Sequence, residues 1–274
     1  MRKRAHTLTI TGIAVGLFLI VLAWYLASYL LISKGNHILP YPHLALYRAL
    51  KLLFWDGAAY TWTSIGYTIG RVLLGFASAF VLGGVFGVLA GLFKLIDGLF
   101  RPGSLLMKAV PTVAVVIVMM GALTAPKTWF LLNYVPSFLT FIVAFPIIFD
   151  ACRAGIANED QSIRDSLSLD CGRTSLKGTI RVLIPDAWPY ISLSLAQSLG
   201  LSFKTAIMAE VLVSSSSLRH GIGAMISLAR INGETENIIA YALIALSIAL
   251  LVDIPFFALK SALARKGYEE SPRA

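Results

Sequence analysis

The stretch TLTITGIAVGLFLIVLAWYLASYLLIS, Thr7 to Ser33, contains no charged residue in 27 positions. A helix needs about 20 predominantly apolar residues to cross the hydrocarbon core of a bilayer, and this run exceeds that length. It is also too long for the apolar core of a signal peptide, so we interpret it as an uncleaved membrane anchor. The sequence therefore predicts an integral membrane protein.

The composition of the whole chain agrees with this interpretation. Of 274 residues, 57% are hydrophobic and only 14% are charged, whereas a soluble domain carries about 25% charged residues. We expect a single all-α transmembrane domain over residues 1–274. The apolar runs predict six transmembrane helices, at about residues 7–33, 61–93, 109–126, 128–149, 187–213 and 237–259.

The distribution of Lys and Arg predicts the orientation in the membrane, because cytoplasmic segments retain an excess of these residues. With the N-terminus inside, fifteen of the 23 Lys and Arg residues fall in cytoplasmic segments and six in outer segments. We therefore predict a multi-pass protein with both termini in the cytoplasm. This asymmetry and contact with anionic lipid account for the net charge of +9, so the charge does not indicate a nucleic-acid partner.

No group of residues in the sequence predicts catalysis or metal binding. The two cysteines, Cys152 and Cys171, lie in the predicted cytoplasmic loop 150–186 and have no clustered histidines beside them. The sequence shows no glycine-rich phosphate loop and no nucleophile with a base placed beside it. We expect that the protein is not an enzyme, that it holds no metal, and that no cofactor binds to this chain.

The loop 150–186 is long for a connection within a helical bundle and is expected to have structure of its own. Its apolar residues fall at spacings of three or four on both sides of Gly172, with charged residues between them. This pattern predicts two short amphipathic helices joined by a glycine turn at the inner membrane surface. The pattern alone fits an interfacial helix pair without a partner equally well.

The same loop resembles the cytoplasmic signature of the membrane permease subunits of ATP-binding-cassette importers. That signature reads roughly Glu-Ala-Ala, three residues, Gly, nine residues, Ile, one residue, Leu-Pro. Here Gly172 is followed by nine residues and then by VLIP, Val182 to Pro185, so the glycine and the proline are in register. The Glu-Ala-Ala positions depart from the signature and hold Ser166, Leu167 and Ser168, with Asp165 one residue upstream.

The resemblance extends over most of the chain and is closest to the nitrate/sulfonate/taurine-type permeases. Those proteins carry an LP-x-P segment after the first span, similar to LPYP at Leu39 to Pro42. Their second span begins with a pattern that Arg71, Gly75 and Phe76 match. Before the last span they have a glutamate followed by G-x-G, similar to Glu210 and the segment Gly221 to Gly223.

The resemblance implies a type I importer permease fold with six transmembrane helices and a cytoplasmic coupling helix, in a bacterial or archaeal inner membrane. It implies ATPase subunits that bind ATP and Mg, a second permease copy or a sister permease, an extracytoplasmic binding protein, and membrane lipid as partners. The substrate would be a small anion such as sulfonate or nitrate, or a vitamin precursor. The residues that would couple to the ATPase are Asp165, Ser166, Leu167, Ser168, Gly172, Arg173, Lys177 and Pro185.

The fifth predicted span is unusually polar, which makes it a candidate wall of a translocation pathway. Its polar residues there are Ser202, Lys204, Thr205 and Glu210. A lysine is costly in hydrocarbon, so Lys204 must line water or find a partner. Two interpretations stay open: a transient site for an anionic substrate, or a structural pair with a carboxylate of another span. Arg71 and Asp253 also lie in or near spans and have no assigned role.

The second predicted span carries small residues at a strict spacing of four. They are Gly75, Ala79, Gly83, Gly87 and Gly91. Such a stripe lets two helix backbones approach closely. The partner helix is either in the same chain or in another subunit.

Two other function classes compete with the importer permease. An ion-gradient-driven secondary transporter would explain charges within spans, but the sequence shows no convincing internal repeat. A membrane scaffold that transports nothing would need no polar pathway in the fifth span. The cytoplasmic signature favours the importer permease over both.

Overall fold

The computed structural model describes residues 2–35, 38–123, 127–158, 178–213 and 220–269, and every regular element in these ranges is a helix. The expected all-α membrane architecture is thus confirmed. In chain order the elements are α1 (Arg2–Ile32), α2 (Pro42–Phe54), α3 (Ala58–Leu92), α4 (Lys94–Ala109), α5 (Thr112–Ala122), η1 (Trp129–Tyr134), α6 (Val135–Ala157), η2 (Thr179–Leu183), α9 (Ile184–Val213), α10 (Ile222–Ile231) and α11 (Thr235–Glu269).

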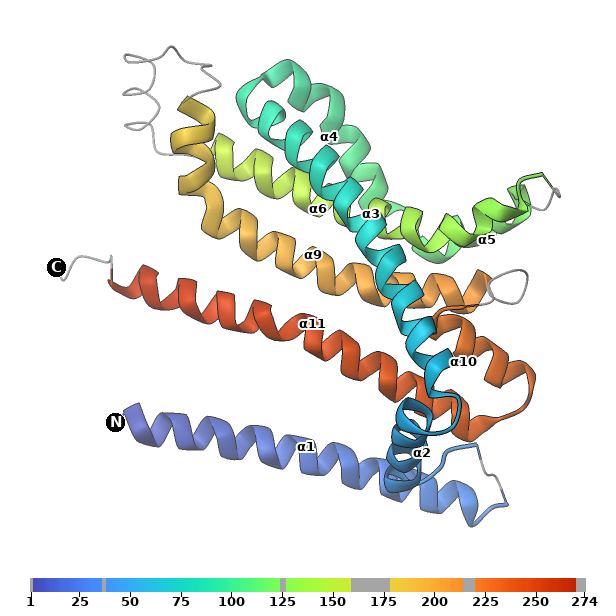
Figure 1. Cartoon of the computed structure of the whole chain (residues 1–274). Coiled ribbons are helices and arrows are strands. Elements are labelled where there is room, and N and C mark those ends of the chain that lie inside the picture. The colour runs from blue at the N-terminus through green and yellow to red at the C-terminus, as the bar shows by residue number, and fades with distance from the viewer. Residues whose placement is uncertain (1, 36–37, 124–126, 159–177, 214–219, 270–274) are drawn as a thin grey trace.

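The axes of the long helices α1, α9 and α11 lie roughly parallel, with α11 running opposite to the other two, and α3 crosses them obliquely (Figure 1). The start of α1, the end of α11, the end of α6 and η2 all lie at one end of the bundle, on the left of Figure 1. The short helices α2 and α10 lie at the opposite end, which we call the α10 end. The two segments that flank the predicted coupling loop therefore lie at the same end of the bundle as the start of α1 and the end of α11.

Four helices are long and apolar enough to cross a membrane: Thr11–Ile32, Ala58–Leu92, Phe130–Ala157 and Thr235–Ile254. They match four of the six expected spans. The expected span 187–213 is a continuous helix, α9, but it is not among these four. Its serines and its two mid-helix charges make it more polar than the others.

The expected third span, 109–126, differs most from the structure. Of these residues, Ala109 is the last of α4 and Thr112–Ala122 form α5, and the two helices are bent by 92° relative to one another at Val110 and Pro111. Val110 is extended, with φ −73° and ψ 125°, as expected for a residue before proline. With 11 residues, α5 is only about 16 Å long at 1.5 Å per residue. The expected span thus contains one short helix, and only the bent pair α4 and α5 together reaches the length of a span.

The core of the bundle is α6, which has 72% of its most apolar window buried. Its side chains Phe145, Ile148 and Phe149 pack in one cluster with Ala187 and Ile191 of α9. The same cluster contains Ala79 and Ala90 of α3, which packs against α6 over most of their length. This three-helix arrangement fixes the relative positions of α3 and α9, which carry the site described below.

The small-residue stripe of α3 packs against α6, so its partner helix is in the same chain. The stripe consists of Gly75, Ala79, Gly83, Gly87 and Gly91. A Cβ added at Gly87 would lie 2.6 Å from the carbonyl oxygen of Phe149 and 2.8 Å from the Cβ of Cys152. At Gly91 the nearest atom would be the Cβ of Ile156, at 2.6 Å. The backbones are close because these side chains are missing.

A second cluster joins α9 to the helices of the α10 end. Phe203 of α9, Ile222 of α10 and Ile244 of α11 are its largest buried side chains. In addition, Arg48 of α2 donates a 2.7 Å hydrogen bond to Asn237 of α11. The N-terminus of α10 is thereby held beside the last turns of α9.

Helix α1 stands apart from this bundle, with only 6% of its apolar window buried. It is held mainly at its end: Trp24 Nε1 and Ser28 Oγ each donate a 3.1 Å hydrogen bond to the carbonyl oxygen of Pro40. Most of its apolar surface is left for lipid or another chain.

Candidate functional site

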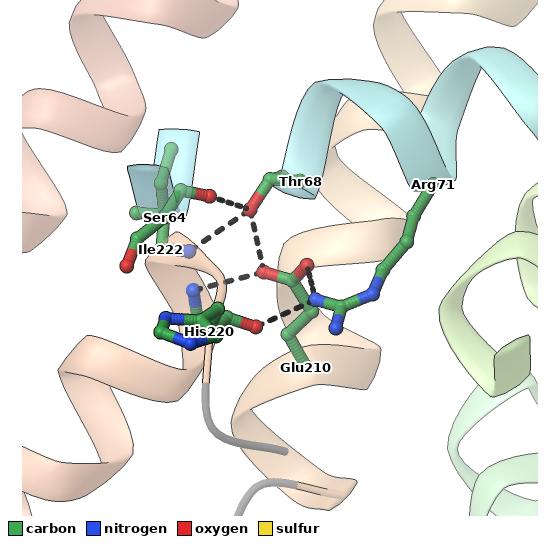
Figure 2. A network of polar contacts seen from close by, with 7 residues as sticks. Ser64, Thr68, Arg71, Glu210, His220 and Ile222 are labelled. Atoms are coloured by element: carbon green, nitrogen blue, oxygen red, sulfur yellow. Dashed lines mark hydrogen bonds and ion pairs between the residues drawn. The ribbon is translucent and has the colours of Figure 1, made fainter. Parts of the chain in front are cut away.

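A buried ion pair links α3 to α9 near the α10 end of the bundle. Arg71 Nη1 lies 2.7 Å from Glu210 Oε1, and the two side chains are 10% and 0% exposed. An unpaired charge would be very costly here, whereas a hydrogen-bonded pair offsets much of the desolvation. Figure 2 shows that the pair is the centre of a larger polar network.

The other oxygen of Glu210 binds a second group of α3 and one group at the start of α10. Its Oε2 accepts hydrogen bonds from Thr68 Oγ1 at 2.8 Å and from the backbone N–H of Gly223 at 3.1 Å. Thr68 Oγ1 in turn accepts from the N–H of Ile222 at 2.9 Å. The carboxylate therefore caps the N-terminus of α10, where the helix dipole favours negative charge.

The two glycines of the G-I-G segment are required by this arrangement. Gly221 has φ +133°, a conformation that side chains disfavour, and a Cβ there would lie 2.7 Å from the carboxyl group of Glu210. A Cβ at Gly223 would lie 2.5 Å from the Cβ of Glu210 and closer still to the carbonyl oxygen of Ile207. The glutamate and the G-x-G thus form one structural unit.

Arg71 also connects the network to His220. Its Nη1 donates a 2.7 Å hydrogen bond to the His220 carbonyl oxygen, and its guanidinium lies 5.6 Å from the centre of the Tyr67 ring. The His220 ring stacks on Tyr67 with centroids 5.0 Å apart and meets Tyr60 edge-on at 5.3 Å. Tyr67 and His220 line a cavity together with Arg71.

The cavity has a volume of about 860 Å³ and opens between the first half of α3 and the segment formed by η1 and the start of α6. Its walls are largely aromatic or small, with a few hydrogen-bonding groups. It is lined by Thr63, Gly66, Tyr67, Gly70, Arg71, Leu74, Phe130, Asn133, Tyr134, Ser137 and His220.

The four residues predicted to line a pathway in α9 do not share one face of the helix. Ser202, Thr205 and Glu210 are buried against the rest of the chain. The side chain of Lys204 is 59% exposed and lies 3.3 Å from Asp253 of α11. Gln197, two turns before Lys204, is exposed on the same face. Of the four predicted residues, Lys204 alone is exposed in this chain.

Most residues predicted to couple to the ATPase lie outside the described residues. They are Asp165, Ser166, Leu167, Ser168, Gly172, Arg173 and Lys177. Pro185 is described and lies exposed in the first turn of α9. The helix that would receive the coupling motion therefore begins directly after the loop.

The network was only partly visible in the sequence. Arg71 and Glu210 were recognised as charges within spans, but their pairing was not predicted, and Thr68 and His220 were missed. The sequence signal for this network is Glu210 followed by the G-I-G segment, Gly221 to Gly223. Among the described residues, no group of three His, Cys, Asp or Glu side chains is placed to hold a metal ion.

One family of known proteins matches the chain over most of its length. Its description is "binding-protein-dependent transport system inner membrane component", and its profile matches residues 83–266, which are 184 of the 274 residues. The match begins within α3 and ends within α11. A comparison with curated proteins found no match.

Proposed function

The chain belongs to the family of binding-protein-dependent transport system inner membrane components, and from this premise we propose that it is the permease subunit of an ATP-driven importer. In this proposal it forms a translocation pathway together with a second copy or a sister permease. ATP and Mg bind to separate ATPase subunits, and an extracytoplasmic binding protein delivers the substrate. The family match from α3 to α11 is the observation that carries the proposal.

The exposed polar face of α9 supports a pathway role for this helix. Lys204 and Gln197 lie on a helix within a bundle whose other long helices are strongly apolar. Exposed groups of this kind are costly against lipid and normally face protein or water. We assign the Lys204 face of α9 to the interior of the permease pair.

The chain itself would not be an enzyme, because ATP hydrolysis takes place on the partner subunits. The substrate would be a small anion such as sulfonate or nitrate, or a vitamin precursor. We also place the protein in a bacterial or archaeal inner membrane, with both termini in the cytoplasm. The excess of Lys and Arg on that side of the predicted topology supports this orientation.

The decisive experiment is purification of the tagged chain from the membrane of its own cells. We expect a nucleotide-binding subunit to copurify and its ATPase activity to rise when the cognate binding protein is added. The solute retained by that binding protein, identified by mass spectrometry, would give the substrate. Uptake that needs an ion gradient, together with absence of an ATPase subunit, would instead establish a secondary transporter.

The coupling role of the loop 150–186 can be tested with Gly172→Val. A β-branched residue should disturb the expected glycine turn, which needs conformational freedom that only glycine has. We predict that binding-protein-stimulated ATPase activity is lost while the amount of permease in the membrane is unchanged. Gly98→Val is the control, because a Cβ at Gly98 on α4 meets no described atom within 4 Å. Normal stimulation in Gly172→Val would refute this role.

A further inference from the structure

We propose that the 860 Å³ cavity between α3 and the η1–α6 segment binds an uncharged, ring-bearing organic solute with hydrogen-bonding groups. The proposal rests on the proposed permease function, because it places a substrate-sized site at the α10 end of the bundle. It selects between the two substrate classes considered above, since a small inorganic anion does not fit this cavity.

The walls of the cavity present flat apolar surfaces. Tyr67 comes from α3, Phe130 and Tyr134 come from η1, and His220 closes the end next to α10. Aromatic rings stack favourably on other rings and enclose them with apolar area. On the α3 side, Gly70 leaves the helix backbone uncovered, since a Cβ there would meet no described atom within 4 Å. A flat molecule can therefore lie against the helix itself.

The cavity walls also contain hydrogen-bonding groups between the aromatic rings. Ser137 is 5% exposed, and its Oγ has no hydrogen-bond partner among the described residues. The Nδ1 atom of His220 is likewise buried and unpartnered among the described residues. Buried polar atoms without partners are rare because they are costly. Neither atom has surface open to the cavity, so the hydrogen-bonding groups that a solute can reach directly are the exposed Asn133 amide and Thr63 hydroxyl.

The charge of the cavity disfavours an anion. Arg71 is the only charged residue among the described residues that line it, and its charge is neutralised by Glu210 at 2.7 Å. Ligand pockets of about 300–1,000 Å³ enclose molecules of organic, drug-like size. A nitrate ion would leave most of this volume to water and would leave the rings without a contact.

The same lining disfavours a lipid chain as the natural occupant. Hydrocarbon cannot satisfy exposed polar groups such as the Asn133 amide and the Thr63 hydroxyl, so burying them against an acyl chain costs free energy. The combination of rings and hydrogen-bonding groups fits a polar heterocycle better. A retained phospholipid is nevertheless one outcome of the test below.

The test uses the permease reconstituted with its ATPase subunits in lipid nanodiscs. Nicotinamide and cytosine serve as uncharged ring probes, and nitrate and methanesulfonate serve as anions. We expect saturable binding of at least one ring probe, measured by ligand-observed NMR titration for the rings and by calorimetry for the anions. Gly70→Leu should raise the Kd of that probe about tenfold or more, because its side chain covers the helix backbone on which the ring would lie.

Gly84→Leu is the matched control, since Gly84 lies on the same helix, outside the cavity lining, and also has no described atom within 4 Å of an added Cβ. It should leave the Kd unchanged. Tyr134→Ala removes an exposed ring from the wall and provides a second variant if Gly70→Leu fails to assemble. Equal loss of binding in the Gly70 and Gly84 variants would overturn the proposal.

Three further results would overturn it. They are absence of ring binding, binding of the anions alone, and a phospholipid that native mass spectrometry finds on the wild type but not on Gly70→Leu. In each of these cases the permease function would still stand if the binding protein stimulates ATP hydrolysis in the same complex. Failure to associate with an ATPase would instead refute the permease function itself.

Discussion

Arg71 and Glu210 show how a charge is held inside a helical bundle that crosses a membrane. Each is buried, and each is bonded to backbone groups of the segment 220–223 as well as to the other. The pair therefore does more than neutralise two charges. It fixes the start of α10 to both α3 and α9, and Arg71 lines the cavity beside Tyr67 and His220.

Replacing Glu210 by Gln should strongly destabilise the protein. The variant leaves Arg71 buried without its counter-charge, and breaking a buried pair from one side costs about 3–5 kcal/mol. We expect a loss of this size in the free energy of unfolding, measured by denaturant titration of the purified protein in mixed micelles. Asp253→Asn is the control, because its pair with Lys204 is partly exposed and such pairs contribute about 0–1 kcal/mol. Equal effects of the two substitutions would contradict the structural role of the buried pair.

Lys204 should behave differently from Arg71 because its side chain is 59% exposed. We predict that Lys204→Met assembles with unchanged thermal stability but loses uptake of the solute that the binding protein delivers. The reason is that its pair with Asp253 contributes little to folding, whereas a charged group facing the pathway holds water or polar solute there. A large fall in Tm would show a structural pair instead. Normal transport in a stable variant would mean that the lysine only reaches toward the membrane surface.

Helix α3 carries two kinds of glycine, and the difference arises from its neighbours. Gly83, Gly87 and Gly91 contact α6 closely, whereas Gly70 and Gly84 face open space among the described residues. A helix can thus pack tightly along one side and leave another side free for a ligand or another chain. The sequence shows both sets as glycines, but only the packed structure separates them.

This contrast gives a direct prediction for α3. Gly87→Leu should lower the yield and the Tm of the complex, because its Cβ would already lie 2.6 Å from the carbonyl oxygen of Phe149. Overpacking of this kind costs about 1–3 kcal/mol or more. Gly84→Leu should change stability by no more than about 0.5 kcal/mol, as surface substitutions usually do. The prediction fails if the two variants have the same Tm and the same yield.

The chain as a whole leaves much of its apolar surface uncovered. Helix α1 is almost entirely exposed. The middle part of α9 also exposes two polar side chains, Gln197 and Lys204. Lipid can cover the apolar surface of α1, but it solvates the polar side chains on α9 poorly. The arrangement fits a subunit that is completed by a partner permease.

The proposed orientation can be tested with single cysteines in a background that lacks Cys152 and Cys171. Lys34→Cys follows α1 and should react with a membrane-impermeant maleimide in intact spheroplasts. Lys94→Cys begins α4, near the opposite end of the bundle, and should react only after lysis. Both lysines are exposed, so differences in labelling report the side of the membrane. The reverse pattern would place the N-terminus outside.

The sequence alone determined that this is a helical membrane protein and where most of its long helices lie. Apolar runs such as 7–33 and 237–259 have only one stable solution in a bilayer, because every backbone group must bond within its own segment. The third expected span, 109–126, begins directly after Lys108, at the position of the bend. Hydropathy did not predict that α5 has only 11 residues, nor that α4, before the bend, pairs with it.

Tertiary structure alone decided which charges pair and which glycines are packed. The spacing of residues along a helix gives the face on which each side chain lies, but not the helix that covers that face. Arg71 and Glu210 are 139 residues apart, and their contact depends on how α3 and α9 both pack on α6. The cavity beside them depends on the same packing, since its walls come from three separate segments of the chain. The local sequence pattern determines where helices form, whereas the packing of the helices on one another brings the residues of the ion pair and the cavity together.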